Sequence, residues 1–320
     1  MSTRADELID RRRLRRKLTF WRIVAFAVIV LAIAVATRQI MGDAAGRSSD
    51  HIAQVRIDGT IFEDEELLER LERIRQTDSV KGVILTIDSP GGTTAGGEAI
   101  YEEVRLLAEA KPVTAQVGTL AASAGYMIAS ATDHIVARQS SIVGSIGVLF
   151  QYPDVSGLMD KLGVKLEEIK SSPLKAEPSP FKPTSDEARQ MIRSMILDSY
   201  DWFVGLVTDR RPLSREEVLK VADGSVFTGR QALDIKLVDA LGGEREAKAW
   251  LVSKGLDEKL EIVEWKKRET ASSMFIPEIA SRFLGVPANG ADILRELGAE
   301  RIFLDGLLSV WQPETNRLSD

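Results

Sequence analysis

Ser123 is the residue in this chain best placed for covalent chemistry. It lies in a run of small residues, Gly-Thr-Leu-Ala-Ala-Ser-Ala-Gly-Tyr, at 118–126. A serine at the start of a helix lies close to unpaired backbone N–H groups, which stabilise a developing negative charge. Small neighbours let a substrate carbonyl approach, and the N–H of Ala124 is placed to donate to it. The pattern indicates nucleophilic attack on a carbonyl, with simple helix capping by the serine hydroxyl as the alternative.

A second candidate element is Asp88-Ser-Pro-Gly91-Gly92, which we expect to form a turn between a strand and a helix. Paired glycines allow backbone N–H groups to face a cavity and to bind an oxyanion, which makes Gly92 a candidate donor beside Ala124. An ordinary strand-to-helix turn explains a lone Pro-Gly-Gly about as well. The sequence lacks the Gly-Lys-Ser/Thr ending of a nucleotide-binding P-loop, which argues against phosphate binding.

The choice of general base is restricted because the chain has no cysteine and only two histidines, His51 and His134. A cysteine nucleophile and a thiolate metal site are excluded, and a multi-histidine metal site would depend on those two residues. We predict no metal and no cofactor. A lysine is the other candidate base, provided that burial and the absence of an acidic partner keep it neutral.

Three lysines occur in or beside a proline-rich loop at 171–183, namely Lys170, Lys175 and Lys182. Four prolines exclude a regular helix or strand there, so we expect a loop that is exposed or lines a cleft. If Lys175 acts as base, its nearest acid, Glu177, should point away from it. The residue pattern alone leaves the three lysines and His134 open as candidates.

Short apolar runs alternate with helical patterns over the first half of the chain, which predicts an α/β fold with a mostly parallel sheet covered by helices. A serine beside glycine recurs after a strand at Ser145. A capping box, Thr184 with Glu187, predicts the start of a helix whose apolar face carries Met191 and Met195. Strands are expected at 52–57, 82–87, 113–117 and 134–137, and helices at 67–74, at 96–110, from Ser123, and after the capping residues Ser214 and Thr228.

Charge and hydropathy point to export across a membrane. Residues 1–17 hold seven Arg or Lys and three acids, a net charge of +4, so the rest of the chain carries −10. The run 23–37 contains no charged residue until Arg38, and the basic side of such a segment stays in the cytoplasm. An acidic body disfavours nucleic-acid phosphates as partners. We expect an uncleaved single-pass anchor, with a cleaved signal peptide at Ala34-Val-Ala36 or a buried core helix as alternatives.

The predicted domains follow from these patterns: a basic cytoplasmic tail (1–17), a transmembrane anchor (18–37), a linker (38–50), a catalytic domain (51–270) and a C-terminal extension (271–320). With 44% hydrophobic residues among 320, the body is large enough for a packed core.

Five motifs in this order resemble the signal peptide peptidase A family of serine peptidases, in its single-length form, within the superfamily of caseinolytic-protease and crotonase folds. The resemblance covers about residues 50–250. The motifs are DSPGG from Asp88, AASAGY around Ser123, GSIGV containing Ser145, IKSSPLK ending at Lys175, and FTGRQALDIKLVDALGG from Phe227.

The resemblance implies repeated ββα units and assigns roles to residues. Ser123 would be the nucleophile and Lys175 the general base, with Ser145 holding Lys175. The N–H groups of Gly92 and Ala124 would bind the oxyanion, where the family commonly has glycine in place of Ala124. The remaining implied contacts are substrate binding at Gly91 and Gly125.

The implied function is an endopeptidase anchored in the inner (plasma) membrane, with its catalytic domain on the periplasmic side. It would degrade cleaved signal peptides and other apolar peptides as a homo-oligomeric ring, with Lys175 reaching the Ser123 of a neighbouring copy. A catalytically inactive, membrane-anchored peptide-binding scaffold is the main alternative. Acyl-coenzyme A chemistry on the same fold would need acidic groups in the cleft and a cytoplasmic setting.

Overall fold

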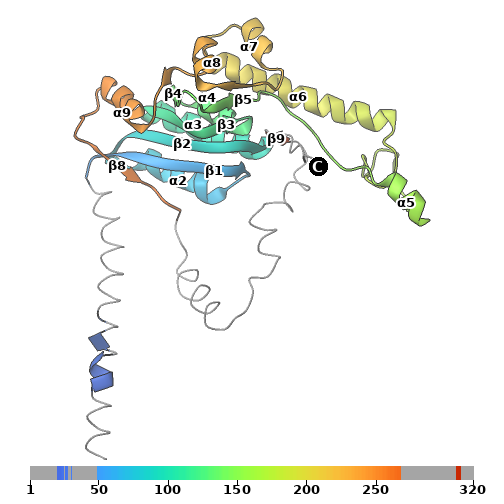
Figure 1. The fold of residues 1–320 in the computed structure, drawn as a ribbon, viewed down its shortest axis with the longest axis horizontal. Helices are drawn as coiled ribbons and strands as arrows, with labels where there is room; N and C mark the ends of the chain where they lie inside the picture. Colours follow the sequence, from blue (N-terminus) through green and yellow to red (C-terminus); the bar gives the residue numbers. More distant parts are fainter. Residues whose placement is uncertain (1–19, 25, 28–29, 31–48, 268–307, 311–320) are drawn as a thin grey trace, which may run out of the picture. The chain divides into compact units, whose positions relative to one another are not determined.

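The computed structural model describes residues 20–24, 26–27, 30, 49–267 and 308–310 (Figure 1). The chain divides into two units, 1–51 and 52–320. None of the helices within the described residues is both long and apolar enough to cross a membrane. The predicted anchor at 18–37 lies mostly outside those residues, and so does the predicted extension at 271–320 apart from Leu308–Val310.

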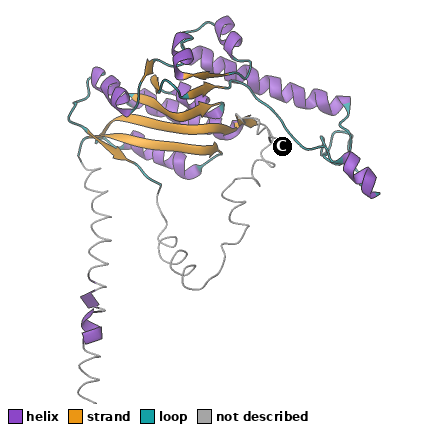
Figure 2. Ribbon diagram, in the orientation of Figure 1, coloured by secondary structure: helices purple, strands orange, loops and turns teal. Residues whose placement is uncertain are grey.

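One sheet forms the centre of the second unit, with helices on both of its faces (Figures 1 and 2). Its main path runs in the order β6-β5-β3-β2-β1-β8, with β4 and β9 joined to β3 and β2 and with β7 joined to β4. The strands are β1 (His51–Ile61), β2 (Val80–Thr93), β3 (Val113–Ala122), β4 (His134–Ala137), β5 (Ile142–Gly144), β6 (Val226–Thr228), β7 (Ala240–Leu241), β8 (Glu261–Glu264) and β9 (Leu308–Val310).

Most of the strand pairs for which the direction is known are parallel. β3 is parallel to β2, β4 and β5, and β4 is parallel to β7, whereas β5–β6 and β2–β9 are antiparallel. The predicted α/β class with a mostly parallel sheet is confirmed. The helices are α2 (Glu65–Gln76), α3 (Thr94–Ala110), α4 (Ala124–Ala131), α5 (Ser156–Leu162), α6 (Asp186–Arg210), α7 (Arg215–Val221), α8 (Gly229–Asp234) and α9 (Glu244–Ser253).

The alternation of side chains along β2 divides the core between the two faces of the sheet. Val83, Leu85 and Ile87 are buried in the larger cluster with residues of α2, α3 and α4. Ile84, which points to the opposite face, is buried with Leu251 of α9. Both faces of this central strand are therefore covered, as its nearly continuous apolar run requires.

The C-terminal end of β2 and the start of α6 differ from the prediction. β2 continues through the expected Asp88–Gly92 turn to Thr93, because it resumes pairing with β3 after a bulge, at Ser89 opposite Ala121. α6 begins one residue later than predicted, with Ser185 rather than Thr184 as its N-cap. The capping boxes that start at Ser214 and Thr228 are confirmed.

The α6 face that we expected to be apolar and buried is only partly covered. Met191 and Ile192 are half-buried, and Met195 and Leu197 are 46% and 50% exposed. The segment 149–185, which we call the arm, includes α5 and leads into α6, and α5 lies beyond the N-terminal end of α6, away from the sheet (Figure 1). The apolar pattern over 191–197 therefore does not reflect packing within one chain, whereas Phe203, Val204 and Val207 of the same helix are buried in the core.

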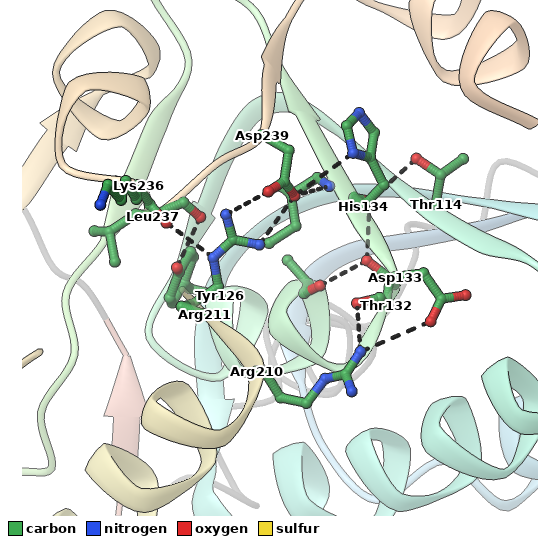
Figure 3. Close-up of polar contacts among 12 residues, drawn as sticks. Thr114, Tyr126, Thr132, Asp133, His134, Arg210, Arg211, Lys236, Leu237 and Asp239 are labelled. Carbon is green, nitrogen blue, oxygen red and sulfur yellow. Dashed lines mark hydrogen bonds and ion pairs between the residues drawn. The ribbon is translucent and has the colours of Figure 1, made fainter. Parts of the chain in front are cut away.

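A buried polar cluster ties the C-terminal end of α6 to the sheet (Figure 3). Arg211 donates two hydrogen bonds to Asp239, at 2.9 and 2.7 Å, and one to the carbonyl of Lys236 at 2.9 Å. Arg210 donates to the carbonyls of Ser130 and Thr132, at the end of α4 and just beyond it. The pair of Arg211 with Asp239 is short and Arg211 is buried, and together with the two bonds of Arg210 it fixes the end of α6 relative to α4 and the sheet.

Candidate active site

Ser123 occupies a strained turn between β3 and α4. Its backbone has φ 55° and ψ −119°, a sparsely populated conformation for a non-glycine residue, and the residue is 1% exposed. Such strain costs about 1–3 kcal/mol and occurs most often at functional sites. The hydroxyl makes no capping hydrogen bond to α4, so the capping alternative is wrong.

Ser145 lies beside Ser123 because β3 and β5 end in register. Ala122 is opposite Gly144, and the N–H of Ser123 donates to the carbonyl of Gly144 at 2.8 Å. Ser145 also has a positive φ, 52°, and its N–H donates to the carbonyl of Ser225 at 2.7 Å. The structure thus brings Ser123 and Ser145 together. Each serine is fixed by a hydrogen bond from its backbone N–H to the carbonyl of another residue.

Gly92 lies under the end of β1, where no side chain fits. A Cβ atom built there would lie 1.8 Å from the carbonyl oxygen of Ile61. Gly91 has φ 105°, which favours glycine, and its N–H donates to the hydroxyl of Ser89 at 3.1 Å. Gly92 is required by this close approach and Gly91 is favoured by its positive φ, and neither residue has a side chain that would keep a substrate carbonyl from the backbone.

Two residues of the same motif, Asp88 and Ser89, have positioning contacts that the sequence did not reveal. Asp88 accepts hydrogen bonds from the N–H groups of Thr119 and Leu120, both at 3.2 Å, across the bulge between β2 and β3. Ser89 donates to the carbonyl of Gly59 in β1 at 2.6 Å. The strand that carries Gly92 is therefore fixed on both sides. The sequence feature that could have predicted this role is a carboxylate directly before the Ser-Pro-Gly-Gly run.

The predicted donor Ala124 and its neighbour Gly125 are buried against other elements. A Cβ atom on Gly97 of α3 would lie 3.0 Å from the Cβ of Ala124, so Gly97 leaves room for the methyl group of Ala124. A Cβ atom on Gly125 would lie 3.0 Å from the carbonyl oxygen of Ser89. Gly125 thus packs α4 closely against β2, which favours a structural role over the predicted substrate contact.

Lys175 lies on the arm and is exposed. Among the described residues, no ion pair or hydrogen bond to its side-chain ammonium group is present. Its backbone N–H donates to the carbonyl of Ser172. The arm is separated from Ser123 in sequence and projects with α5 beyond α6 (Figure 1). The structure of one chain therefore joins Ser123 with Ser145 but leaves Lys175 in solvent.

The two rival lysines are held in a ring of alternating charges. Lys170 lies 3.0 Å from Glu168 and 2.7 Å from Glu177, and Lys182 lies 2.8 and 2.5 Å from the same two carboxylates. We call these four residues the arm ring. Hydrogen bonds from Lys170 and Lys182 lower the pKa of Glu177 to about 2. Glu177 is therefore engaged by other lysines, as expected for an acid that must not pair with Lys175.

His134, the remaining candidate base, is at the wrong end of the sheet. It pairs with Thr114 near the start of β3, nine residues before Ser123, which corresponds to about 30 Å along an extended strand. Its ring stacks on Trp250 and lies 3.8 Å from Asp239, and burial lowers its pKa (Figure 3). The histidine belongs to the buried polar cluster and not to the serine site.

A strained serine at a sharp turn between a parallel strand and a helix, beside backbone fixed by glycines, is the arrangement typical of the nucleophile of a serine hydrolase. Residues 105–256 match the family model described as peptidase family S49, and residues 54–143 match the model described as Clp protease.

Relatives of the chain carry protease names. A protein of Methanocaldococcus jannaschii, provisionally named a protease, is 40% identical over 199 residues, which cover 62% of this chain and 64% of the relative. Another provisionally named protease, from Synechocystis sp., is 36% identical over 66% of this chain and 77% of the relative. The chloroplastic serine protease SPPA of Arabidopsis thaliana is 32% identical over 75% of this chain and 36% of that protein. The chain belongs to peptidase family S49, the serine proteases of the signal peptide peptidase A type.

We expect Gly92→Ala to destabilise the protein by at least about 3 kcal/mol, since the new methyl group overlaps backbone that cannot rotate away. Gly157→Ala is the control, because a Cβ atom there meets nothing within 4 Å and the backbone is helical. The measurement is the midpoint of thermal unfolding. Equal midpoints for the two variants would show that the end of β1 yields, and that glycine is not required at this position.

The arm ring should lose stability in acid. The pKa of Glu177 in the folded protein, about 2, is below the ordinary value of 4.5 for a glutamate. Its carboxylate therefore stabilises the arm above about pH 4.5, and this contribution is lost as the pH falls toward 2. Glu177→Gln should increase amide hydrogen exchange in the arm at pH 6 and reduce its pH dependence. Glu167→Gln, an exposed acid in the same segment, is the matched control, and equal exchange in both variants would contradict the assignment.

Proposed function

We propose that this protein is a membrane-anchored serine endopeptidase that cleaves apolar peptides, such as signal peptides left in the membrane, outside the cytoplasm. The observation that carries the proposal is the strained backbone of Ser123, whose hydroxyl does not cap α4 and which lies beside Ser145 in a member of family S49. Ser123 attacks the peptide carbonyl, and the N–H groups of Gly92 and Ala124 stabilise the resulting oxyanion. Lys175, held by Ser145, accepts the proton from Ser123 and returns it to the leaving amine.

The exposed apolar side chains of the arm support an assembly in which Lys175 comes from a neighbouring copy. Ile169 is fully exposed, and large apolar residues on both sides of Lys175, in the arm and in the N-terminal half of α6, are 40% exposed or more. A concentration of this kind is typical of a protein interface. The residues are Leu158, Leu162, Val164, Leu166, Ile169, Leu174, Phe181, Met195 and Leu197.

Docking of the arm on a second copy would also change the environment of Lys175. A neutral lysine requires burial and no acidic partner, and the arm ring already occupies Glu168 and Glu177. Covering the arm would remove water from the ammonium group and favour its neutral form. A homo-oligomeric ring would repeat this arrangement at each interface.

The substrate class is tested with two fluorogenic peptides of equal length, one apolar and one with alternating Lys and Glu. We expect kcat/KM to be at least about tenfold higher for the apolar peptide, since burial of each additional large side chain contributes about 1.5–3 kcal/mol before the costs of binding. Equal values for the two peptides would argue against apolar remnants as substrates.

The proposed location is tested by topology. The +4 tail before an uncharged apolar run predicts that the body is exported. A compartment-sensitive reporter fused after Asp320 should be active only outside the cytoplasm. Reversing the sign of the tail charges, by replacing Arg11, Arg12 and Arg13 with Glu, should reduce export. A reporter that is active only in the cytoplasm would contradict both the topology and the proposed substrate.

A further inference from the structure

β2 and β3 lie side by side in the centre of the sheet (Figure 1), and the register of their pairing changes just before the serine site. Ile87 lies opposite Val117, a difference of 30 in residue number. The next pair, Ser89 and Ala121, differs by 32. β3 therefore uses three residues, 118–120, where β2 uses one, and we call these three residues the bulge. Bulges are frequent next to active sites, where they change the direction of a strand.

Asp88, the one residue of β2 opposite the bulge, holds it through its side chain. Its two carboxylate oxygens accept hydrogen bonds from the N–H groups of Thr119 and Leu120, one each, at 3.2 Å. From another direction, the hydroxyl of Ser141 donates to the carbonyl of Gly118 at 2.6 Å. A Cβ atom on Gly118 would lie 2.9 Å from a carboxylate oxygen of Asp88, so glycine leaves room for the carboxylate. Two side chains thus fix the shape of the bulge.

The bulge determines which residues of the two strands lie level with each other at the site. Counting on from the pair after the bulge, Gly92 lies level with Ala124, whereas the earlier register would put it level with Ala122. The start of α4 does lie beside this part of β2, since a Cβ atom on Gly125 would be 3.0 Å from the carbonyl oxygen of Ser89. Two residues of strand correspond to about 7 Å, and an oxyanion donor must lie within about 3 Å of the oxygen. The bulge is therefore required for one oxygen atom to reach both N–H groups.

We propose that Asp88 is a positioning residue for catalysis, which keeps the N–H of Ala124 level with that of Gly92 by holding the bulge. The inference rests on the proposed roles of these two N–H groups as oxyanion donors. Asp88 acts through the backbone of β3. A carboxylate suits this task because both of its oxygens only accept hydrogen bonds. An asparagine has one such oxygen, so its NH₂ group would face one of the two backbone N–H groups and push the bulge away.

Loss of this positioning should affect the transition state more than the bound substrate. The oxyanion forms only as Ser123 attacks, so a displaced donor lowers kcat and leaves KM almost unchanged. Displacement of a catalytic group by about 1 Å costs about 100-fold in rate. We therefore expect Asp88→Asn to lower kcat about 100-fold and to change KM by less than about twofold.

The matched control in the full chain is Asp257→Asn. The carboxylate of Asp257 also accepts a backbone N–H, that of Lys259 at 2.9 Å, but it does so between α9 and β8. This variant should keep wild-type kcat and KM. Amide hydrogen exchange at Thr119 and Leu120 should be faster in Asp88→Asn than in the control, and equal exchange would show that Asp88 does not hold the bulge.

Ser141→Ala tests the bulge independently of Asp88, because it removes the hydrogen bond to the carbonyl of Gly118. It should lower kcat about tenfold without a matching change in KM. Ser253→Ala, which removes a similar bond to the carbonyl of Trp250 in α9, is its control and should keep wild-type kinetics.

Two ligands separate positioning from a general loss of structure. A peptide boronate forms a tetrahedral adduct with the serine and places an oxygen at the oxyanion site, so Asp88→Asn should weaken its inhibition about 100-fold. Binding of a labelled apolar peptide, measured by fluorescence anisotropy in a Ser123→Ala background, should change less than about twofold. Equal losses for both ligands, or no loss for the boronate, overturn the inference. A Ser123→Ala chain that keeps wild-type activity would instead show that the proposed catalysis is wrong, and the inference falls with it.

Discussion

The Ser123→Ala chain is expected to lose peptidase activity by a factor of about 10⁴–10⁶, the range found when the nucleophile of a serine protease is removed. Ser123 is held in a strained turn and its N–H donates to the carbonyl of Gly144, whereas the neighbouring Ser145 is proposed to hold Lys175. The fold should persist, since the substitution removes one oxygen that does not cap α4. Activity on a peptide ester and labelling by a fluorophosphonate are the two measurements.

Ser130→Ala is the matched control, because this serine is also buried in α4 and its hydroxyl donates to the carbonyl of Met127 in its own helix. It should keep both labelling and activity. A folded wild-type chain that is not labelled would favour the inactive scaffold. Labelling that persists in Ser123→Ala would show that another serine is the nucleophile.

Mixed oligomers of Ser123→Ala and Lys175→Ala chains should regain activity that neither variant has alone. In a single chain Lys175 is exposed on an arm that projects beyond α6, whereas Ser123 is buried at the end of β3. An interface that pairs an intact Lys175 with an intact Ser123 would restore the complete site. For random mixing of equal amounts, about one quarter of the interfaces should do so.

The measurement is kcat in assemblies purified through two different tags, one on each variant. Lys165→Ala, which changes an exposed lysine of the same arm, should keep wild-type activity and shows that loss of charge on the arm is not the cause. Mixed assemblies as inactive as their parents would mean that the site forms within one chain. In that case the arm must fold back onto its own sheet.

The sequence predicts elements best where the local pattern and the tertiary contacts agree. The serine motif places Ser123 between a strand and a helix, and the structure confirms that position through β3 and α4. The nearly continuous apolar run of β2 indicates burial on both faces, and the capping boxes at Ser214 and Thr228 are local hydrogen-bond patterns. These features depend on neighbours within a few residues.

The remainder depends on contacts that no local pattern contains. Glycines and a proline at 90–92 predict a turn, but pairing with strands distant in sequence keeps this stretch extended within β2. The role of Asp88 depends on the two N–H groups it meets on β3. The spacing of apolar residues in α6 predicts a buried face, yet Met195 is exposed in one chain. Such spacing indicates that a helix face is covered, but it does not identify the surface that covers it.

The length of α6 sets the reach of the arm. Its C-terminal end is anchored by Arg210 and Arg211, and its 25 residues correspond to about 37 Å of helix. Each residue added within it would advance the arm by about 1.5 Å and rotate it by about 100°. The length of α6 therefore determines both how far the arm extends and in which direction it points. In a relative whose α6 is longer or shorter by one residue, the lysine that corresponds to Lys175 would point in a different direction.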